Sequence, residues 1–193
     1  MTAVPAALLS ALPGALLDAA EASRLRVRGA TEAAVLVALY GGPDGDVHAV
    51  LTERRADLRR HAGEIAFPGG RRDPGDADLR ATALREAQEE IGLDPAAVQI
   101  LGALQPTPTI ATGYAIYPYV GVIPAAQAWT ASPREVQEVL EMPLSAIRAG
   151  YGRRRLLRRG VPIRTDTYVV ADQLIWGATA RILADLFDRI DTL

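Results

Sequence analysis

An apolar run of eight residues, AAVLVALY (33–40), is followed at once by the turn-rich segment GGPDGD (41–46) and then by VHAVLTERR (47–55). Two strand-like runs joined by a segment dense in glycine, proline and aspartate predict a β-hairpin. Further strands are predicted over 64–70, 98–105 and 114–123. Helices are predicted from about Ala77 to Ile91, near PLSAI within 134–148, and from about Ile175 onward. This mixture of strands and helices predicts an α/β fold.

The organisation that fits this pattern is a single domain over residues 1–193, because no linker, repeat or low-complexity segment interrupts it. Residues 1–30 are expected to form an N-terminal arm, helical from about Pro5 to Arg24. The apolar N-terminus lacks a basic leading segment, and prolines and acidic residues interrupt it, which argues against a secretory signal and a membrane span. A cytoplasmic location is therefore expected.

The amino-acid composition excludes several kinds of catalytic and metal sites. The chain has no Cys, which excludes thiol catalysis and disulfides, and no Lys, which excludes a P-loop or Schiff-base lysine. With only two His, a multi-histidine metal site is not expected. The net charge of −2 argues against a nucleic-acid partner, and no feature predicts the oligomeric state. The expected partner is a small molecule.

Three glutamates crowd the end of the predicted helix in LREAQEEIGLD (84–94): Glu86, Glu89 and Glu90. Like charges one turn apart destabilise a helix by roughly 0.2–0.5 kcal/mol, and carboxylates at its C-terminus oppose the helix dipole. One interpretation is a solvated face with Arg80 and Arg85 as ion-pair partners. The other is a divalent cation, which prefers oxygen ligands and would offset both penalties.

The stretch GGRRDPGDADLRATALREAQEEIGL (69–93) resembles the signature of Nudix hydrolases, G-x5-E-x7-R-E-U-x-E-E-x-G-U, where U is aliphatic. Its second half is filled by Arg85, Glu86, Ala87, Glu89, Glu90, Gly92 and Leu93. The first half departs from the signature, because the interval from Gly70 to Arg85 is one residue too long. The first acidic position is therefore occupied by Asp76 or displaced onto Ala77. The segment of about 70–93 is interpreted as the Nudix box.

A second segment, LTERRADLRRHAGEIAFPGG (51–70), resembles the sequence that precedes the box in the coenzyme A pyrophosphatase branch of this superfamily. The matching residues are Leu51, Thr52, Arg54, Arg59, Gly63 and Phe67 to Gly70. Val50 and Arg55 depart from the branch pattern. The extra residue in the box and the stretch IWGATARIL near the C-terminus are also similar to this branch.

These resemblances imply an α/β/α sandwich with a central mixed sheet, a metal site on the helix of the box, and hydrolysis of the coenzyme A pyrophosphate to 3′,5′-ADP and 4′-phosphopantetheine with Mg²⁺ or Mn²⁺. Glu86 and Glu90, one turn apart, are the expected main metal ligands. Glu89 and the Gly70 carbonyl are further candidates, and Arg85 is expected to orient a glutamate. Expected substrate contacts come from Arg54, Arg59, Gly69 and Gly70. The general base is sought among Glu89, Glu135 and Glu138.

Alternatives stay open at this point. The substrate of a Nudix enzyme could instead be ADP-ribose or another nucleoside diphosphate derivative, and a Nudix-like domain could bind a nucleotide or metal without catalysis. The arginine cluster at 153–159 is interpreted as solvated surface. Tyr114 and Tyr117 are expected to fill a sheet face, and His48, which follows the strand alternation, is expected to be simply packed or exposed. For His61, a substrate contact and a structural or exposed role both stay open.

Overall fold

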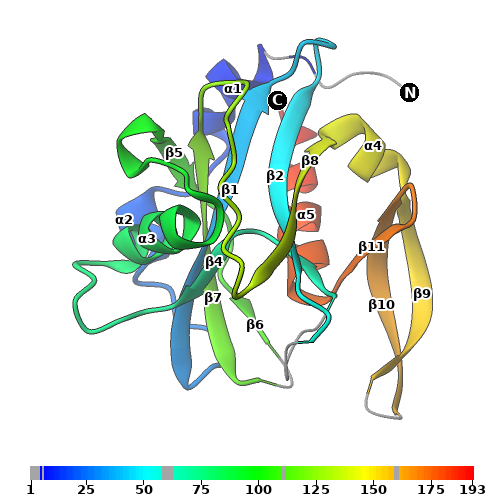
Figure 1. Ribbon diagram of the computed structural model, residues 1–193. Helices are drawn as coiled ribbons and strands as arrows, with labels where there is room; N and C mark the ends of the chain where they lie inside the picture. Colours follow the sequence, from blue (N-terminus) through cyan, green and yellow to red (C-terminus); the bar gives the residue numbers. More distant parts are fainter. Residues whose placement is uncertain (1–4, 6, 58–62, 110–111, 159–160) are drawn as a thin grey trace.

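A mixed β-sheet forms the centre of the molecule (Figure 1). The computed structural model describes residues 5, 7–57, 63–109, 112–158 and 161–193. The order of the sheet is β3-β2-β1-β7-β5, with β4, β6 and β8 paired to β1, β7 and β2. β1 and β7 run parallel, and the other pairs are antiparallel. The strands are β1 (Thr31–Gly41), β2 (Val47–Arg54), β3 (Ile65–Ala66), β4 (Gly69–Arg71), β5 (Gln99–Ala103), β6 (Thr107–Pro108), β7 (Tyr114–Val122) and β8 (Val136–Pro143).

Two long helices cover the two faces of this sheet: α3 (Leu79–Ile91) and α5 (Gly177–Ile190). Alternate side chains of β1 serve the two layers, as the two-residue period of a strand requires. Leu36 and Ala38 belong to the core beneath α3, whereas Val37 and Leu39 belong to the core beneath α5. The expected α/β/α sandwich is thus confirmed, and β1 reads as a continuous apolar run because both of its faces are buried.

The predicted hairpin is confirmed, since β1 pairs with β2 from Ala38–Val50 to Gly41–Val47. The strand expected over 64–70 is instead two short strands separated at Pro68. β3 pairs with β2, and β4 pairs with β1. Because β7 and β8 occupy the outer edges of β1 and β2, this segment lies between the two strands where they diverge. Gly69 and Gly70 are thereby brought into the middle of the sheet.

One expectation about the helices needs correction. The N-terminal arm is not one helix: it consists of α1 (Leu8–Ala11), the 3-10 turn η1 (Leu12–Gly14) and α2 (Ala19–Ala22), because Pro13 and Gly14 interrupt it. The short helix expected near PLSAI is α4 (Leu144–Ala149), and the residues before it form β8 along the edge of β2. The last helix, expected from about Ile175, begins at Gly177, directly after the strand that contains Ile175.

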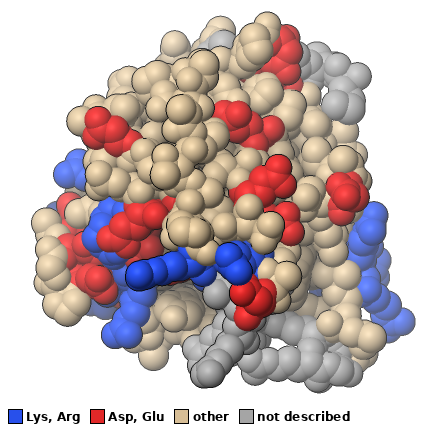
Figure 2. Space-filling model, in the orientation of Figure 1, with Lys and Arg blue, Asp and Glu red and all other residues tan. Residues whose placement is uncertain are grey.

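A second, three-stranded sheet was not predicted. It contains β9 (Tyr151–Arg158), β10 (Val161–Val170) and β11 (Gln173–Trp176), in the order β11-β10-β9. Tyr168 anchors it, with its ring centroid 5.8 Å from that of Phe187 on α5. Arg153, Arg154 and Arg155 of the 153–159 cluster are exposed, and basic side chains follow the β9 edge in Figure 2.

No helix within the described ranges is both long enough and apolar enough to cross a membrane. Tyr117 is buried in the core beneath α3, as expected for a residue that fills a sheet face, and Tyr114 lies at the start of the same strand and is partly buried.

Candidate functional site

The helix α3 carries the glutamate cluster and has well-defined ends. Asp78 is its N-cap, because its Oδ1 atom accepts a hydrogen bond of 2.7 Å from the Ala81 amide. Gly92 ends the helix in the left-handed conformation with φ 71°, which glycine adopts without strain. The three glutamates therefore occupy the last turn and a half of α3.

Glu90 is the buried member of the cluster, with 4% of its surface exposed. Its carboxylate accepts a hydrogen bond of 3.0 Å from the Gly69 amide and lies 3.4 Å from Arg54 Nη1. Burial raises the pKa of Glu90 to about 7, although the Gly69 hydrogen bond and Arg54 both act to lower it. The buried charge is thus only partly compensated by the protein itself.

Glu86 lies one turn earlier on α3 and faces Gly70. A Cβ atom at Gly70 would lie 2.5 Å from Glu86 Cδ, so a larger residue at this position would displace the carboxylate. Burial raises the pKa of Glu86, and the charges of Glu89 and Glu135 add to the effect against that of Arg85. The glycine pair thus packs directly on the two inner glutamates, since Gly69 bonds Glu90 and Gly70 faces Glu86.

Arg85 connects α3 to the loop before it. Its Nε and Nη2 atoms donate to the two Asp76 carboxylate oxygens at 2.9 and 3.0 Å, and Nη1 lies 3.0 Å from Glu86 and 3.1 Å from Glu89. Asp76 also accepts hydrogen bonds from the Thr82 hydroxyl and the Asp73 amide. The guanidinium holds the pKa of Asp76 well below its usual range. Asp76 therefore fixes the orientation of the Arg85 guanidinium, which in turn contacts Glu86.

Asp76→Asn is expected to lower the free energy of unfolding by about 2 kcal/mol at pH 7, because hydrogen bonds to charged groups contribute roughly 1.5–3 kcal/mol. The depressed pKa of Asp76 stabilises the folded state fully above about pH 4, the pKa of an unfolded aspartate, and this contribution is lost as the pH falls further. Urea unfolding followed by circular dichroism gives the free energy of unfolding of wild type and variant at pH 7 and at pH 3.5. Asp73→Asn is the control, since Asp73 is exposed. An equal difference from wild type at both pH values would contradict the assignment.

Arg54, at the end of β2, bridges α3 to a second acidic residue. Its Nη2 atom lies 3.3 Å from Glu135, while Nη1 faces Glu90. The Arg54 Nε atom is buried and has no hydrogen-bond partner among the described groups. Glu135 thereby joins the glutamate cluster electrostatically, and its charge raises the pKa of both Glu86 and Glu90.

The loop that carries Glu135 is tied to the end of α3. The Thr130 and Ser132 amides donate to the carbonyls of Ile91 and Glu90 at 3.0 and 2.8 Å, which satisfies acceptors that a helix end leaves open. Arg55 donates 2.8 Å to the Pro133 carbonyl from the other side. The anchoring is made mostly by backbone groups, so no side-chain pattern in the sequence could have revealed it.

Not every residue expected at the site takes part in this cluster. Glu89 points outward, with 59% of its side chain exposed, and pairs with Arg85. Arg85 is the partner that the solvated-face interpretation expected for it, whereas Arg80 lies 3.9 Å from Asp78. Glu138 is exposed on β8 opposite Glu53. Arg59 and His61 lie outside the described residues, and His48 pairs with Asp44 in the β1–β2 turn region.

The donor set fits a hard divalent cation. Within the described ranges, no three His, Cys, Asp or Glu side chains form a preassembled cage. Mg²⁺ does not require one, because it is commonly held by one or two carboxylates together with water and substrate phosphates. Glu86 and Glu90 offer two such carboxylates, both with raised pKa values that a nearby cation would reverse. In Figure 2 acidic and basic side chains gather over the α3 region.

Comparison with known proteins agrees with this arrangement. A family model described as NUDIX domain matches residues 30–159. The chain is 43% identical over 157 residues to the protein named "Uncharacterized Nudix hydrolase NudL" of Salmonella paratyphi B, covering 80% of each chain.

Two solved structures share the fold. A MutT protein from Methanosarcina mazei Go1 matches with a TM-score of 0.54 at 18% identity, covering 87% of this chain and 97% of that one. The NUDIX domain of Shewanella oneidensis NrtR, complexed with ADP ribose, matches with a TM-score of 0.51 at 20% identity, covering 65% and 79%. Because the family model covers residues 30–159 and the NudL relative is 43% identical over 80% of both chains, the chain belongs to the Nudix hydrolase family.

Proposed function

We propose that this protein is a coenzyme A diphosphatase that depends on Mg²⁺ or Mn²⁺. Water is added across the P–O–P bond of coenzyme A, which yields 3′,5′-ADP and 4′-phosphopantetheine. Coenzyme A esters and oxidised coenzyme A are proposed as further substrates. Hydrolysis of pyrophosphate bonds is the reaction of the family to which the chain belongs, and coenzyme A is the narrower proposal.

One observation carries the substrate proposal: the segment 51–70, which resembles the coenzyme A branch, contributes directly to the glutamate cluster. Its first part supplies Arg54, which lies 3.4 Å from Glu90, and its last part supplies Gly69, whose amide bonds the same carboxylate. Phe67 is buried between these two ends and holds the segment in the core beneath α5. A segment with branch-specific residues that also builds the site supports a role in recognising that branch's substrate.

Glu86 and Glu90 are proposed to hold the cation, with the Gly70 carbonyl as a backbone ligand. Glu89 is proposed to contact the cation indirectly, through a water molecule bound to it. When bound, a divalent cation neutralises charge on a diphosphate and acidifies a coordinated water. The protein's own contribution is orientation. The Arg85 guanidinium holds Glu86 in place and the Gly69 amide holds Glu90, so the position of each carboxylate is fixed by a donor.

Glu135 is proposed as the general base that accepts the proton of the attacking water. About half of its side chain is exposed, so water and substrate can reach it, and it lies across Arg54 from Glu90. Glu89, the other main candidate, is held by Arg85 on the outer side of α3. Arg54 is proposed to contact the diphosphate, because a guanidinium already positioned between two carboxylates can turn one donor pair toward phosphate oxygens.

The purified protein is expected to hydrolyse coenzyme A with Mg²⁺ or Mn²⁺ at a kcat/KM at least tenfold above that for ADP-ribose, NADH or diadenosine polyphosphates. Chromatographic detection of 3′,5′-ADP and 4′-phosphopantetheine measures the reaction. Preference for ADP-ribose, the ligand seen in the NrtR domain, would replace the coenzyme A assignment with the broader nucleoside diphosphate one. Binding without turnover of any substrate would instead indicate a regulatory domain.

A further inference from the structure

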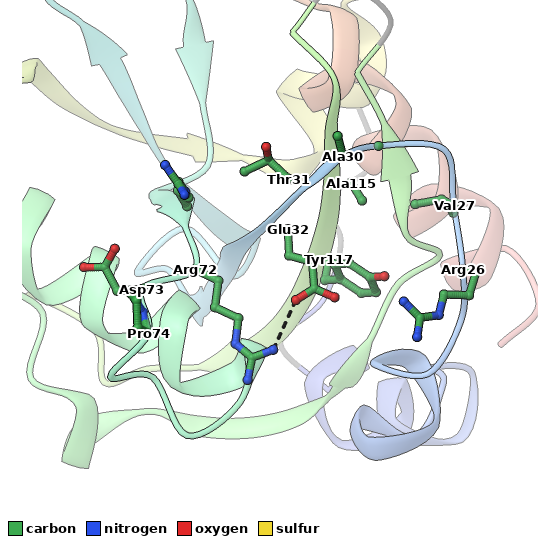
Figure 3. Close-up of a pocket in the computed structure, with 12 residues that line it drawn as sticks. Arg26, Val27, Ala30, Thr31, Glu32, Arg72, Asp73, Pro74, Ala115 and Tyr117 are labelled. Atoms are coloured by element: carbon green, nitrogen blue, oxygen red, sulfur yellow. Dashed lines mark hydrogen bonds and ion pairs between the residues drawn. The ribbon is translucent and has the colours of Figure 1, made fainter.

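A pocket of about 510 Å³ lies beside the glutamate cluster and is not used by the chemistry described above (Figure 3). Its walls come from the segment that leads into β1, the loop that follows β4, and the start of β7. Pockets for small molecules commonly measure about 300–1,000 Å³, so this one has room for a nucleoside-sized group. Val27, Pro74 and Ala115 provide apolar surface, and the Tyr117 ring forms part of the wall.

Some of the charged side chains in this pocket are paired with an opposite charge, and others are not. Arg72 pairs with Glu32 at 3.1 Å, which is the dashed contact in Figure 3. Arg26 also lines the pocket and has no ion-pair partner within the described parts of the chain. Arg26 is close enough to Tyr117 for its charge to act on the pKa of that hydroxyl. An uncompensated guanidinium group favours an anionic ligand, and guanidinium forks match phosphate oxygens in particular.

One carboxylate, that of Asp73, lies at the other end of the pocket, away from Arg26 (Figure 3). A carboxylate accepts hydrogen bonds from hydroxyl or amino groups but repels phosphate. The pocket therefore has a cationic end and an acceptor end with apolar surface between them. A phosphorylated nucleoside has the same succession of groups: a phosphate, a ribose with hydroxyls, and a flat base with an amino group.

The pocket is continuous with the glutamate cluster through β4. Gly70 faces Glu86, and the next residue, Arg71, lines the pocket. Arg85 fixes this junction, because its Nη2 atom donates 3.1 Å to the Arg71 carbonyl. Ala115 and Tyr117 belong to the same core as Ala83 and Ala87 of α3, so pocket and cluster lie on one side of the sheet. The residue by which the 70–85 interval exceeds the Nudix signature also falls in the loop between them.

We propose that this pocket binds the 3′-phosphorylated nucleoside end of the substrate, with Arg26 facing the 3′-phosphate. The proposal deepens the function given above and rests on it for the identity of the substrate. The other end of coenzyme A, the pantetheine arm, is uncharged and would leave the Arg26 guanidinium without a counter-charge. Placing the nucleoside here directs the diphosphate past Gly70 toward Glu86 and Glu90.

The test is titration calorimetry of the two reaction products, adenosine 3′,5′-bisphosphate and 4′-phosphopantetheine, against wild type, Arg26→Ala and Arg28→Ala in the presence of Mg²⁺. Arg28 is the matched control, because it is an exposed arginine two residues away that does not line the pocket. Arg26→Ala is expected to weaken binding of the bisphosphate about tenfold, because the variant loses a charge-assisted hydrogen bond to the 3′-phosphate. The affinity of Arg26→Ala for adenosine 5′-monophosphate should fall less than threefold, and its affinity for 4′-phosphopantetheine should equal that of wild type.

An Arg26→Ala protein that binds the bisphosphate as tightly as Arg28→Ala would overturn the assignment of the pocket. Equal losses for adenosine 5′-monophosphate and the bisphosphate would also overturn it, because the 3′-phosphate would then make no specific contact. These results are independent of turnover. If bisphosphate binding depends on Arg26 but coenzyme A is not hydrolysed, the assignment of the pocket is supported and the proposed function is contradicted. If coenzyme A is hydrolysed but bisphosphate binding does not depend on Arg26, the proposed function is supported and the assignment of the pocket is contradicted.

Discussion

Glu90→Gln is expected to lower the kcat for hydrolysis more than about 100-fold, because loss of even an outer partner of a metal site costs about 10–100-fold. Glutamine keeps the size of the side chain and can still accept the hydrogen bond from the Gly69 amide. It cannot supply the negative charge that a divalent cation requires. Glu86→Gln should have an effect of similar size for the same reason. Steady-state kinetics with Mg²⁺ and with Mn²⁺ measure both variants.

The fold should survive the Glu90→Gln substitution. Burial raises the pKa of Glu90 to about 7, so a neutral side chain there removes an unfavourable buried charge. The free energy of unfolding without metal should therefore stay within about 1 kcal/mol of wild type. The expected difference appears when Mn²⁺ is added: the melting temperature of wild type should rise, whereas that of Glu90→Gln should not. A normal kcat together with a normal Mn²⁺ response would remove Glu90 from the metal site.

Glu135→Gln is expected to lower kcat about 100-fold or more while KM changes little, because a positioned general base contributes roughly 10²–10⁴-fold. The carboxylate lies beside the cluster through Arg54, and glutamine retains its size and a hydrogen-bond acceptor. Only the capacity to take up a proton is lost. The measurement is steady-state kinetics with coenzyme A, together with Mn²⁺ binding to show that the metal site is intact.

Glu138→Gln provides the matched control for this substitution. Glu138 is a glutamate three residues further along the chain, exposed on β8 and opposite Glu53. Its variant should retain nearly the full activity of wild type. If Glu135→Gln were equally active, the base would have to be sought elsewhere, and Glu89 would be the first residue to test.

The sequence by itself determined the elements whose signals are local. The β1–β2 hairpin follows from apolar runs around a glycine- and aspartate-rich turn, and the end of α3 follows from Gly92, because only the local backbone conformation decides them. The pairing of Glu86 and Glu90 on one helix is equally local, since it depends only on the helical period. Family membership was readable from the same residues, because they form one continuous stretch.

Elements that depend on a distant partner could not be predicted in this way. VQEVLEMP forms β8 because β2 offers a free edge to it, and the β9–β10 hairpin depends on Tyr168 packing against α5. The split of 64–70 into two strands likewise results from the divergence of β1 and β2, which no short segment encodes.

Within the site, only the tertiary structure decided which of three similar glutamates is buried. Glu90 faces the sheet and Glu89 faces solvent, although the two glutamates are adjacent in the sequence. Glu135 joins them from 45 residues away through Arg54 and through backbone hydrogen bonds to the end of α3. Helical period and turn chemistry act over a few residues, whereas burial and long-range pairing depend on how the whole chain packs. The sequence therefore determined the chemical groups of the site, and the packing decided the environment of each one.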